Sequence, residues 1–308
     1  MIRPSQNRTS QACDLCGAAQ SELILTTPRL DGPLVRCRNC QLYYVVLPGE
    51  KNRTGQYLSE QAAAEMVRLA ERARDLALVE PEVEENEGPW RELMARERLA
   101  DLKRFATSGS LLEIGCSTGE LLAAAGASFT AKGVEADRKT SRIAIARGLD
   151  CLNSTLSDAR FPPDYFDVVA LYHVIEHFHS PRAEVREMCR ILKPGGWLVV
   201  ETPNIATFWY RLLNGRWRQF IPDHIFFFTP QTMTRLCEEN GFKVRELRSA
   251  GKAMSVRLFI NRLGRFHQPS ARVLSGLSDR LDLNDRTLRL KLGDVMRIYA
   301  QKRMRDEG

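Results

Sequence analysis

The chain has 308 residues, of which 44% are hydrophobic and 27% charged, with a formal net charge of +7. This length and composition are typical of a soluble globular protein with one ordinary core and an appendage. No window approaches the roughly 18 to 20 apolar residues of a membrane span, and the start, MIRPSQNRTSQ, is not apolar. We therefore expect a cytoplasmic protein. The positive charge allows an anionic partner: nucleic acid, a nucleotide-linked substrate or a lipid surface.

Four of the eight cysteines form a regular pattern near the N-terminus. Cys13 and Cys16 make one C-x2-C pair, and Cys37 and Cys40 make a second, with twenty residues between the pairs. This spacing lets two short knuckles offer four thiolates to one tetrahedral zinc ion. Disulfide bonding is the alternative, and a reducing cytosol disfavours it. We predict a structural zinc ribbon over residues 1–50.

The remaining elements are predicted from composition and periodicity. A strand over 43–47 ends at the Pro-Gly pair that follows it, and helices are expected over 56–80 and 90–106, separated by the acidic loop VEPEVEENEGP. Strands and helices alternate over 110–250, which predicts parallel strands joined by crossover helices, the α/β class. The segment 252–292 is basic and mostly helical, and VMRIYAQK reads as a last strand.

The stretch SLLEIGCSTGELLAAAGA predicts a strand, a glycine turn and a helix. Gly115 and Gly119 expose backbone N–H groups and leave no side chain to block a ligand that lies across the turn. A phosphate loop is excluded, because Glu120 and Leu121 follow where Lys and Ser or Thr are needed. The dinucleotide pattern is also missing, since the turn lacks a middle glycine. A ligand with a nucleoside but no phosphate fits better.

Three further segments follow in order. AKGVEADRKT supplies a second apolar strand that ends at Glu135, where doubly wound sheets place an acid that accepts from both ribose hydroxyls. The alternative is an exposed loop carboxylate. DYFDVVALYHVIEHF predicts a buried strand and then a turn that carries His173, Glu176 and His177. ILKPGGWLVVETPN predicts a helix end, a Pro-Gly-Gly turn and another buried strand.

Together these segments resemble a class I S-adenosylmethionine-dependent methyltransferase. LLEIGCSTGELL is similar to the first motif of that family, GVEAD to the acidic ribose position, and the other two segments to the fourth-strand and fifth-strand motifs. The resemblance implies a doubly wound, Rossmann-like, seven-stranded sheet over 109–308, preceded by a helical linker or cap over 51–108. It also implies S-adenosylmethionine as cofactor, beside the structural zinc.

The resemblance implies a set of cofactor contacts. The methionine part would lie against Glu113, Gly115, Cys116 and Gly119. Glu135 would hold the ribose, and the adenine would lie near Thr155 and Leu156. Many relatives carry an aspartate where Thr155 aligns. The full set is Glu113, Gly115, Cys116, Gly119, Glu135, Thr155, Leu156 and Tyr172.

The resemblance extends beyond the catalytic core. A four-cysteine knuckle followed by helices and this core is similar to a bacterial subgroup associated with polysaccharide and other secondary biosynthesis. The segment TPNIATFWYRLLNGRWRQFIPDHIFFFTPQTMTRLCEENGF resembles that subgroup's insertion after the fifth strand. An insertion over about 204–230 would lie above the carboxyl ends of the strands, where open α/β sheets bind ligands. We expect it to be a lid over the acceptor.

The expected reaction is methyl transfer to an oxygen or nitrogen, less favourably a carbon, of a small molecule such as a sugar or a secondary-metabolite intermediate. The cofactor carries the activated methyl group, so the protein must position the acceptor and, for a hydroxyl, remove a proton. Our first candidate base is His224, the second is His177, and His173 is a third, with Glu176 and Asp223 as orienting partners. The alternative for each histidine is a purely structural role. A metal-ligand role for His224 is disfavoured, because no second ligand is spaced beside it.

Two rival functions stay open. A zinc-ribbon RNA methyltransferase or nucleic-acid binder would use Arg211, Arg216, Trp217 and Arg218 of the insertion, but the ribbon lacks a dense basic-aromatic stripe. The Asn/Asp-Pro-Pro-Tyr motif for amine targets is also missing, so a nucleic-acid partner is disfavoured. An NAD-dependent oxidoreductase is disfavoured by the glycine spacing. The basic segment 252–292 is expected to cover its own core, or to dock on a partner subunit or peripherally on a membrane.

Overall fold

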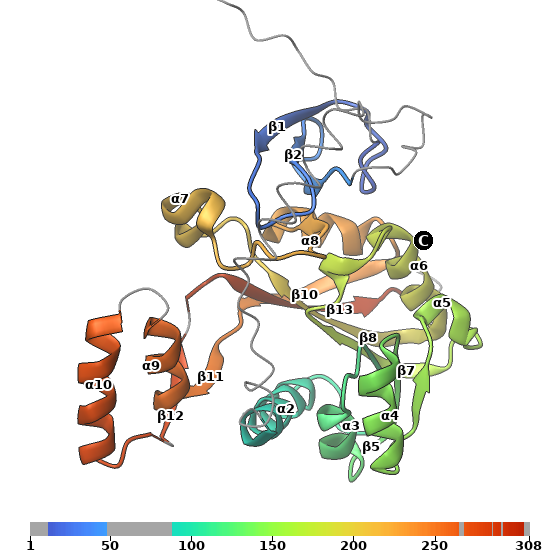
Figure 1. Cartoon of the computed structure of the whole chain (residues 1–308). Coiled ribbons are helices and arrows are strands. Elements are labelled where there is room, and N and C mark those ends of the chain that lie inside the picture. The colour runs from blue at the N-terminus through green and yellow to red at the C-terminus, as the bar shows by residue number, and fades with distance from the viewer. Residues whose placement is uncertain (1–11, 48–87, 265–267, 285, 291, 305–308) are drawn as a thin grey trace, which may run out of the picture.

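The computed structural model describes residues 12–47, 88–264, 268–284, 286–290 and 292–304. The helix expected over 56–80 lies outside these ranges. Within them, a central sheet is covered by helices, a small ribbon lies above one end of it, and a helical projection extends from its edge (Figure 1). None of the described helices is both long and apolar enough to span a bilayer.

The central sheet has seven strands and is mostly parallel. In spatial order the strands are β10 (Phe242–Ser249), β13 (Val295–Lys302), β8 (Leu192–Pro203), β7 (Phe166–Tyr172), β4 (Gly109–Ile114), β5 (Phe129–Glu135) and β6 (Cys151–Asn153). Neighbours from β8 to β6 run parallel, whereas β13 is antiparallel to both β8 and β10. The doubly wound α/β prediction is therefore confirmed, as is the last strand VMRIYAQK.

Helices cover both faces of the sheet. α2 and α3 pack on one face with Val168 and Ala170 of β7, and α5, α6 and α8 pack on the other with Val169 and Leu171. Because successive side chains of a strand point to opposite faces, β7 is buried on both sides. The helix expected over 90–106 is confirmed as α2. The helices on the sheet are α2 (Gly88–Leu102), α3 (Glu120–Ala125), α4 (Arg138–Ala146), α5 (Leu156–Ala159), α6 (Pro181–Ile191) and α8 (Pro230–Glu238).

The ribbon and the insertion share a second, four-stranded sheet. Its order is β1 (Ser21–Leu25), β2 (Leu34–Cys37), β3 (Tyr43–Val45) and β9 (Phe226–Phe227). Strand β9 comes from the insertion between β8 and α8, and it pairs antiparallel with β3, Tyr43 opposite Phe227. Trp217, Phe220 and Phe227 of the insertion pack against Leu34 of the ribbon in one apolar cluster. The ribbon therefore supports the segment that we expected to act as a lid.

A second contact ties the ribbon to the start of α6. The side chain of Asp14 accepts hydrogen bonds from the Ser180 hydroxyl, at 2.7 Å, and from the backbone N–H of Arg182, at 2.8 Å. A carboxylate at a helix N-terminus satisfies free N–H groups and complements the helix dipole. Ser180 itself caps α6, and Pro181 occupies its first turn.

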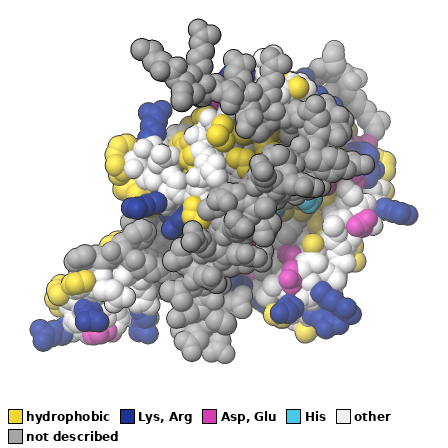
Figure 2. Space-filling model, turned by 45° about the horizontal axis from the view of Figure 1, so that its top comes forward, with side chains coloured by type: hydrophobic (Ala, Val, Ile, Leu, Met, Phe, Trp, Pro, Cys, Tyr) yellow, Lys and Arg dark blue, Asp and Glu magenta, His cyan; other side chains and the backbone are white. Residues whose placement is uncertain are grey.

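The basic segment projects from the edge of the sheet. It contains α9 (Val256–Gly264) and α10 (Gln268–Arg280), as expected, but also a two-stranded hairpin of β11 (Lys252–Ser255) and β12 (Thr287–Leu290) that the sequence analysis missed. The hairpin brings the chain back to β13. On α10, Val273 and Leu277 are exposed, and apolar and basic side chains lie side by side on this projection (Figure 2).

Candidate active site

The glycine turn joins β4 to α3 in a conformation that requires glycine. Gly115 has φ +70° and Gly119 has φ +85°, both in the left-handed region. A Cβ at Gly115 would lie 2.4 Å from Val174 Cγ2, and one at Gly119 would lie 2.3 Å from Leu149 Cδ1. A side chain at either position would therefore be strained by the backbone conformation and would force its neighbour to shift.

Glu135, the last residue of β5, lies directly over this turn. Its Oε2 accepts from the backbone N–H of Ser117 at 2.9 Å, and its Oε1 accepts from that of Asp137 at 2.8 Å. The carboxylate is partly exposed. A carboxylate in this place can give up its hydrogen bonds from backbone N–H groups and accept hydrogen bonds from the hydroxyl groups of a ligand that lies across the turn.

A buried polar group occupies the ends of β4 and β7. Burial raises the pKa of Glu113 to about 8, and the nearby guanidinium of Arg98 opposes this only in part. Arg98, from α2, lies over the Tyr172 ring at 4.1 Å from its centroid and donates to Glu201 Oε1 at 3.1 Å. Three buried polar atoms here have no hydrogen-bond partner among the described residues: Glu113 Oε2, the Tyr172 hydroxyl oxygen and Arg98 Nε. Such atoms call for a polar ligand.

Arg98 was not among the residues singled out from the sequence. Helix α2 carries several arginines, and Arg96 is exposed on the same helix while Arg98 is largely buried. No spacing rule distinguishes the two in the sequence. Only the packing of α2 against the sheet shows which arginine reaches the site.

Three expected cofactor residues turn their side chains elsewhere. Cys116 Sγ lies 3.3 Å from Cys151 Sγ in a buried cluster. Thr155 caps α5 by accepting from the N–H of Asp158 at 3.2 Å, and Leu156 is buried in the core. The side chains at these positions are therefore engaged within the protein, and the N–H of Cys116 donates to the Val134 carbonyl at 3.2 Å.

The three candidate histidines converge on one buried carboxylate. Glu176 lies in the short helix η2 (Ile175–His177) just after β7, and its side chain is fully buried. Its Oε1 lies 3.3 Å from His173 Nδ1 and 4.0 Å from His224 Nε2. The rings of His177 and His224 meet edge to face, with centroids 4.7 Å apart. The fold thus brings together residues that are far apart in the sequence.

Asp223, expected to be an orienting partner, contacts His177 through its backbone. Its carbonyl oxygen lies 2.9 Å from His177 Nδ1, and its N–H donates to Asp31 Oδ2 at 3.0 Å. In the same way the carbonyl of Gln219 lies 2.9 Å from His224 Nδ1. Two backbone carbonyls therefore orient the two imidazole rings.

The charges of this cluster follow from burial and proximity. Burial opposes the ionisation of Glu176, but His173 and His224 outweigh it, and the pKa of Glu176 is lowered. Burial also opposes the ionisation of Glu201, yet Arg98 and the nearby His173 hold its pKa well below the usual range. Burial lowers the pKa of His224 to about 4, only partly offset by Glu176. At neutral pH the cluster therefore holds ionised carboxylates and a neutral His224 imidazole.

The four ribbon cysteines form a compact thiol cluster. Cys13 Sγ lies 3.4 Å from Cys40 Sγ, and Cys16 Sγ lies 3.6 Å from Cys37 Sγ. All four sulfur atoms lie within 4.8 Å of one another. A tetrahedral zinc ion with Zn–S bonds of about 2.3 Å holds its sulfur atoms about 3.8 Å apart. The distances between the four thiols are close to this value, so the donor set fits zinc.

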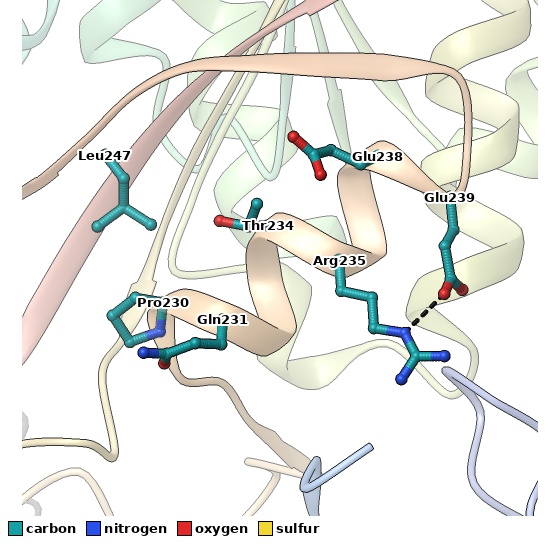
Figure 3. A pocket seen from close by; sticks show the side chains of 7 residues that line it. All are labelled: Pro230, Gln231, Thr234, Arg235, Glu238, Glu239 and Leu247. Carbon is teal, nitrogen blue, oxygen red and sulfur yellow. Dashed lines mark hydrogen bonds and ion pairs between the residues drawn. The ribbon is translucent and has the colours of Figure 1, made fainter. Parts of the chain in front are cut away.

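Two cavities lie away from both the glycine turn and the histidine cluster. One of about 700 Å³ runs along α8, where Arg235 and Glu239 form an ion pair at 2.6 Å (Figure 3). The other, of about 460 Å³, is lined by residues of α5 and α6, among them Ser157 and Arg190. Neither is lined by the glycine turn or by the histidine cluster, so neither is taken as the reaction site.

Comparisons with known proteins agree with this arrangement. A family model described as a methyltransferase domain matches residues 87–247, just over half of the chain. Ubiquinone biosynthesis O-methyltransferase from Thiobacillus denitrificans is 27% identical over 167 residues, covering 49% of this chain and 72% of the relative. The protein of that name from Cereibacter sphaeroides is 32% identical over 146 residues, covering 42% and 59%. The chain spans only about half the length of several other curated relatives.

Among solved structures, one chain of the complex that contains the Haloferax volcanii Trm112 methyltransferase activator aligns with a TM-score of 0.51. It is 17% identical, and the alignment covers 70% of this chain and 92% of that one. This likeness supports the fold alone. The match to the family model, the sheet topology and the glycine turn agree with one another. The chain therefore belongs to the methyltransferase domain family and is a class I S-adenosylmethionine-dependent methyltransferase.

Proposed function

We propose that this enzyme transfers the methyl group of S-adenosylmethionine to a hydroxyl oxygen of a small molecule. The observation that carries the proposal is the placement of two sites side by side at the carboxyl ends of the parallel strands. The glycine turn and Glu135 follow β4 and β5, and the histidine cluster around Glu176 follows β7. The names of the two ubiquinone O-methyltransferase relatives favour oxygen over nitrogen or carbon as the acceptor atom.

For the cofactor, we assign each part of the site to one part of the ligand. Glu135 accepts from the ribose hydroxyls. The ligand lies across the glycine turn, where the absence of side chains permits a close approach; the N–H groups of Gly115 and Gly119 are not free donors, because they donate to the carbonyls of Val134 and Cys116 at 2.8 Å. Arg98 binds the carboxylate of the methionine part, and Glu113 its ammonium group, because Arg98 Nε and Glu113 Oε2 are buried without a hydrogen-bond partner among the described residues. When bound, S-adenosylmethionine supplies an activated methyl group on its sulfonium.

For the acceptor, we propose that its hydroxyl docks against the histidine cluster and loses its proton there. His224 was our first candidate for the base, but a pKa of about 4 makes its imidazole a weak base at neutral pH. The cluster as a whole is therefore the better assignment, with His177 at its partly exposed side. The insertion that carries His224 packs against this side of the cluster, and a sugar or a secondary-metabolite intermediate is the acceptor class that we propose.

We also propose that Cys13, Cys16, Cys37 and Cys40 hold one structural zinc ion. All four positions of a tetrahedral ion would be filled by protein thiolates, which leaves none for substrate. A reduced thiol set of this kind suits a reducing compartment, and we propose the cytoplasm.

Nucleic acid is disfavoured as the acceptor, because two of the residues that would have contacted it are engaged within the protein. Trp217 is fully buried in the core shared by the ribbon and the insertion, and Arg218 forms an ion pair with Asp294 at 2.5 Å. An aromatic-basic binding surface would need both features to be exposed together.

The proposed function is tested by a mass-spectrometric screen of nucleotide sugars and small hydroxylated metabolites with S-adenosylmethionine. We expect one acceptor class to gain a single methyl group on oxygen, located by fragmentation. The Glu135→Ala variant serves as the control for enzyme-dependent transfer. A methyl group found only on nitrogen or carbon would overturn the oxygen assignment.

A further inference from the structure

Three side chains of the histidine cluster have the composition of a metal site. Glu176, His177 and His224 each place one possible ligand atom within 4.8 Å of the others. Two imidazoles and one carboxylate are the protein ligands of many catalytic zinc sites and of non-haem iron sites. No second ligand lies beside His224 in the chain, which disfavours a metal-ligand role from the sequence alone, but the fold supplies two.

The hydrogen bonds around the cluster orient these groups as ligands. His177 and His224 each direct Nδ1 to a backbone carbonyl at 2.9 Å, so Nδ1 carries the hydrogen and Nε2 keeps its lone pair. Glu176 Oε2 accepts from the Thr202 hydroxyl at 2.9 Å. Metal-binding histidines and carboxylates are held by partners of this kind in known sites. Each of the three side chains thus has one atom engaged in support and another directed to the cluster.

The distances suit an ion better than direct hydrogen bonds within the triad. His224 Nε2 and Glu176 Oε1 are 4.0 Å apart, which is too far for a hydrogen bond. An ion bound at about 2.0 to 2.2 Å from both atoms would bring them slightly closer together. Glu176 is fully buried and His224 is 6% exposed, so bulk water has little access to the space between them, although Glu176 Oε1 also lies 3.3 Å from His173 Nδ1.

We propose that Glu176, His177 and His224 form a binding site for a divalent first-row transition-metal ion, separate from the four-cysteine site. Three protein ligands leave at least one coordination position open. The site also joins the insertion to the catalytic core, because His224 lies in the insertion while Glu176 and His177 follow β7.

One consequence rests on the proposed function. A hydroxyl oxygen bound at the open position would lose its proton more readily, because a divalent cation stabilises the alkoxide. The proton would leave to solvent or to His173, which lies beside Glu176. Metal binding itself does not depend on methyl transfer, so the two can be tested apart.

The test uses the full chain purified without chelator, with its ribbon saturated by Zn²⁺. Co²⁺ is then titrated and followed by absorption and by metal analysis. We expect one further equivalent to bind, with a spectrum that lacks a sulfur-to-cobalt charge-transfer band. His224→Ala and His177→Ala should abolish this binding, whereas His179→Ala, an exposed histidine two residues farther on, should retain it. His177→Gln gives the same readout if His224→Ala fails to fold.

A supporting group offers a sharper check. Thr202→Val keeps the shape of the side chain but removes the hydroxyl that donates to Glu176, and it should weaken Co²⁺ binding by about 10- to 100-fold. Absence of the further equivalent, or its retention in both His177→Ala and His224→Ala, would overturn the metal site. Calorimetry with S-adenosylmethionine is run on the same variants. If the unmodified protein binds S-adenosylmethionine but no further Co²⁺, the metal site fails while the cofactor part of the proposed function stands.

Discussion

Val45 of the ribbon donates its backbone N–H to the carbonyl of Ile225, at 2.8 Å. The N–H of Ile225 in turn donates to the carbonyl of Glu176, also at 2.8 Å. Ile225 follows His224 directly, so a short chain of backbone hydrogen bonds runs from the ribbon through the insertion to the histidine cluster. The ribbon is therefore part of the support of the site.

Loss of the ribbon's metal should disturb the distant site. Cys37→Ser is expected to lower the zinc content by one equivalent and to lower the melting temperature, because such an ion contributes about 10 to 16 kcal/mol to local folding. Methyl transfer should fall with it, since β3 then no longer holds β9. Metal analysis, thermal melts and turnover are compared with Cys189→Ser, which changes a half-buried thiol outside the ribbon. Full zinc content in Cys37→Ser would refute the assignment.

Glu135→Ala should weaken the binding of S-adenosylmethionine. Loss of a charged acceptor for two hydroxyls costs about 1.5 to 3 kcal/mol of binding free energy. Calorimetry measures this, with Asp150→Ala as the control, because Asp150 is an exposed acid nearby that pairs with Lys132. An unchanged affinity would remove Glu135 from the ribose site, and tight binding of NAD would contradict the cofactor assignment.

Arg98→Gln should affect only ligands that carry the methionine carboxylate. We expect about a tenfold or greater loss of affinity for S-adenosylmethionine, because a hydrogen bond to a charged partner contributes about 1.5 to 3 kcal/mol. Binding of methylthioadenosine, which lacks the amino-acid part, should be unchanged. Arg96→Gln, at an exposed position on the same helix, is the matched control. Equal losses for both ligands would mean that Arg98 acts only through its contacts with Tyr172 and Glu201.

The fold could be predicted because its evidence is local. Each motif combines a buried strand with a turn, and Gly115, Gly119 and Glu135 stand at the strand ends where the chain must bend. The pairing of β9 with β3 could not be predicted, since Phe226–Phe227 is too short to show a period and its partner Tyr43 is far away in the chain. The approach of His224 to Glu176 depends on that pairing, which is why the candidate histidines were identified singly but their convergence was not.

His177→Ala should separate chemistry from cofactor binding. If the cluster removes the acceptor's proton, turnover should fall by about 10² to 10⁴. Affinity for S-adenosylmethionine should stay the same, because His177 lies in η2 and outside the glycine turn. Turnover, cofactor affinity and melting temperature are measured beside His179→Ala. Near-normal turnover in His177→Ala would favour simple positioning of the acceptor, without proton removal by the cluster.

Glu113 should make both stability and cofactor binding depend on pH. Burial raises its pKa in the folded protein to about 8, above the ordinary value of 4.5, so the folded state binds more protons than the unfolded state between these values. Stability is then highest at low pH and falls as the pH rises from about 4.5 to 8. Glu113→Gln should remove this loss of stability. As the pH rises across this range, the melting temperature of the variant should therefore increase relative to that of the unmodified protein.

Cofactor binding should act on the same carboxyl in the opposite direction. The ammonium group that we place beside Glu113 favours the ionised form, so binding at pH 7 should release a proton from Glu113. Calorimetry in buffers of different ionisation enthalpy measures that release, and affinity should rise with pH up to about 8. Protons lost by the ligand itself are common to both proteins, so the difference from Glu113→Gln isolates this carboxyl. Equal proton release in the two proteins would place the ammonium group elsewhere.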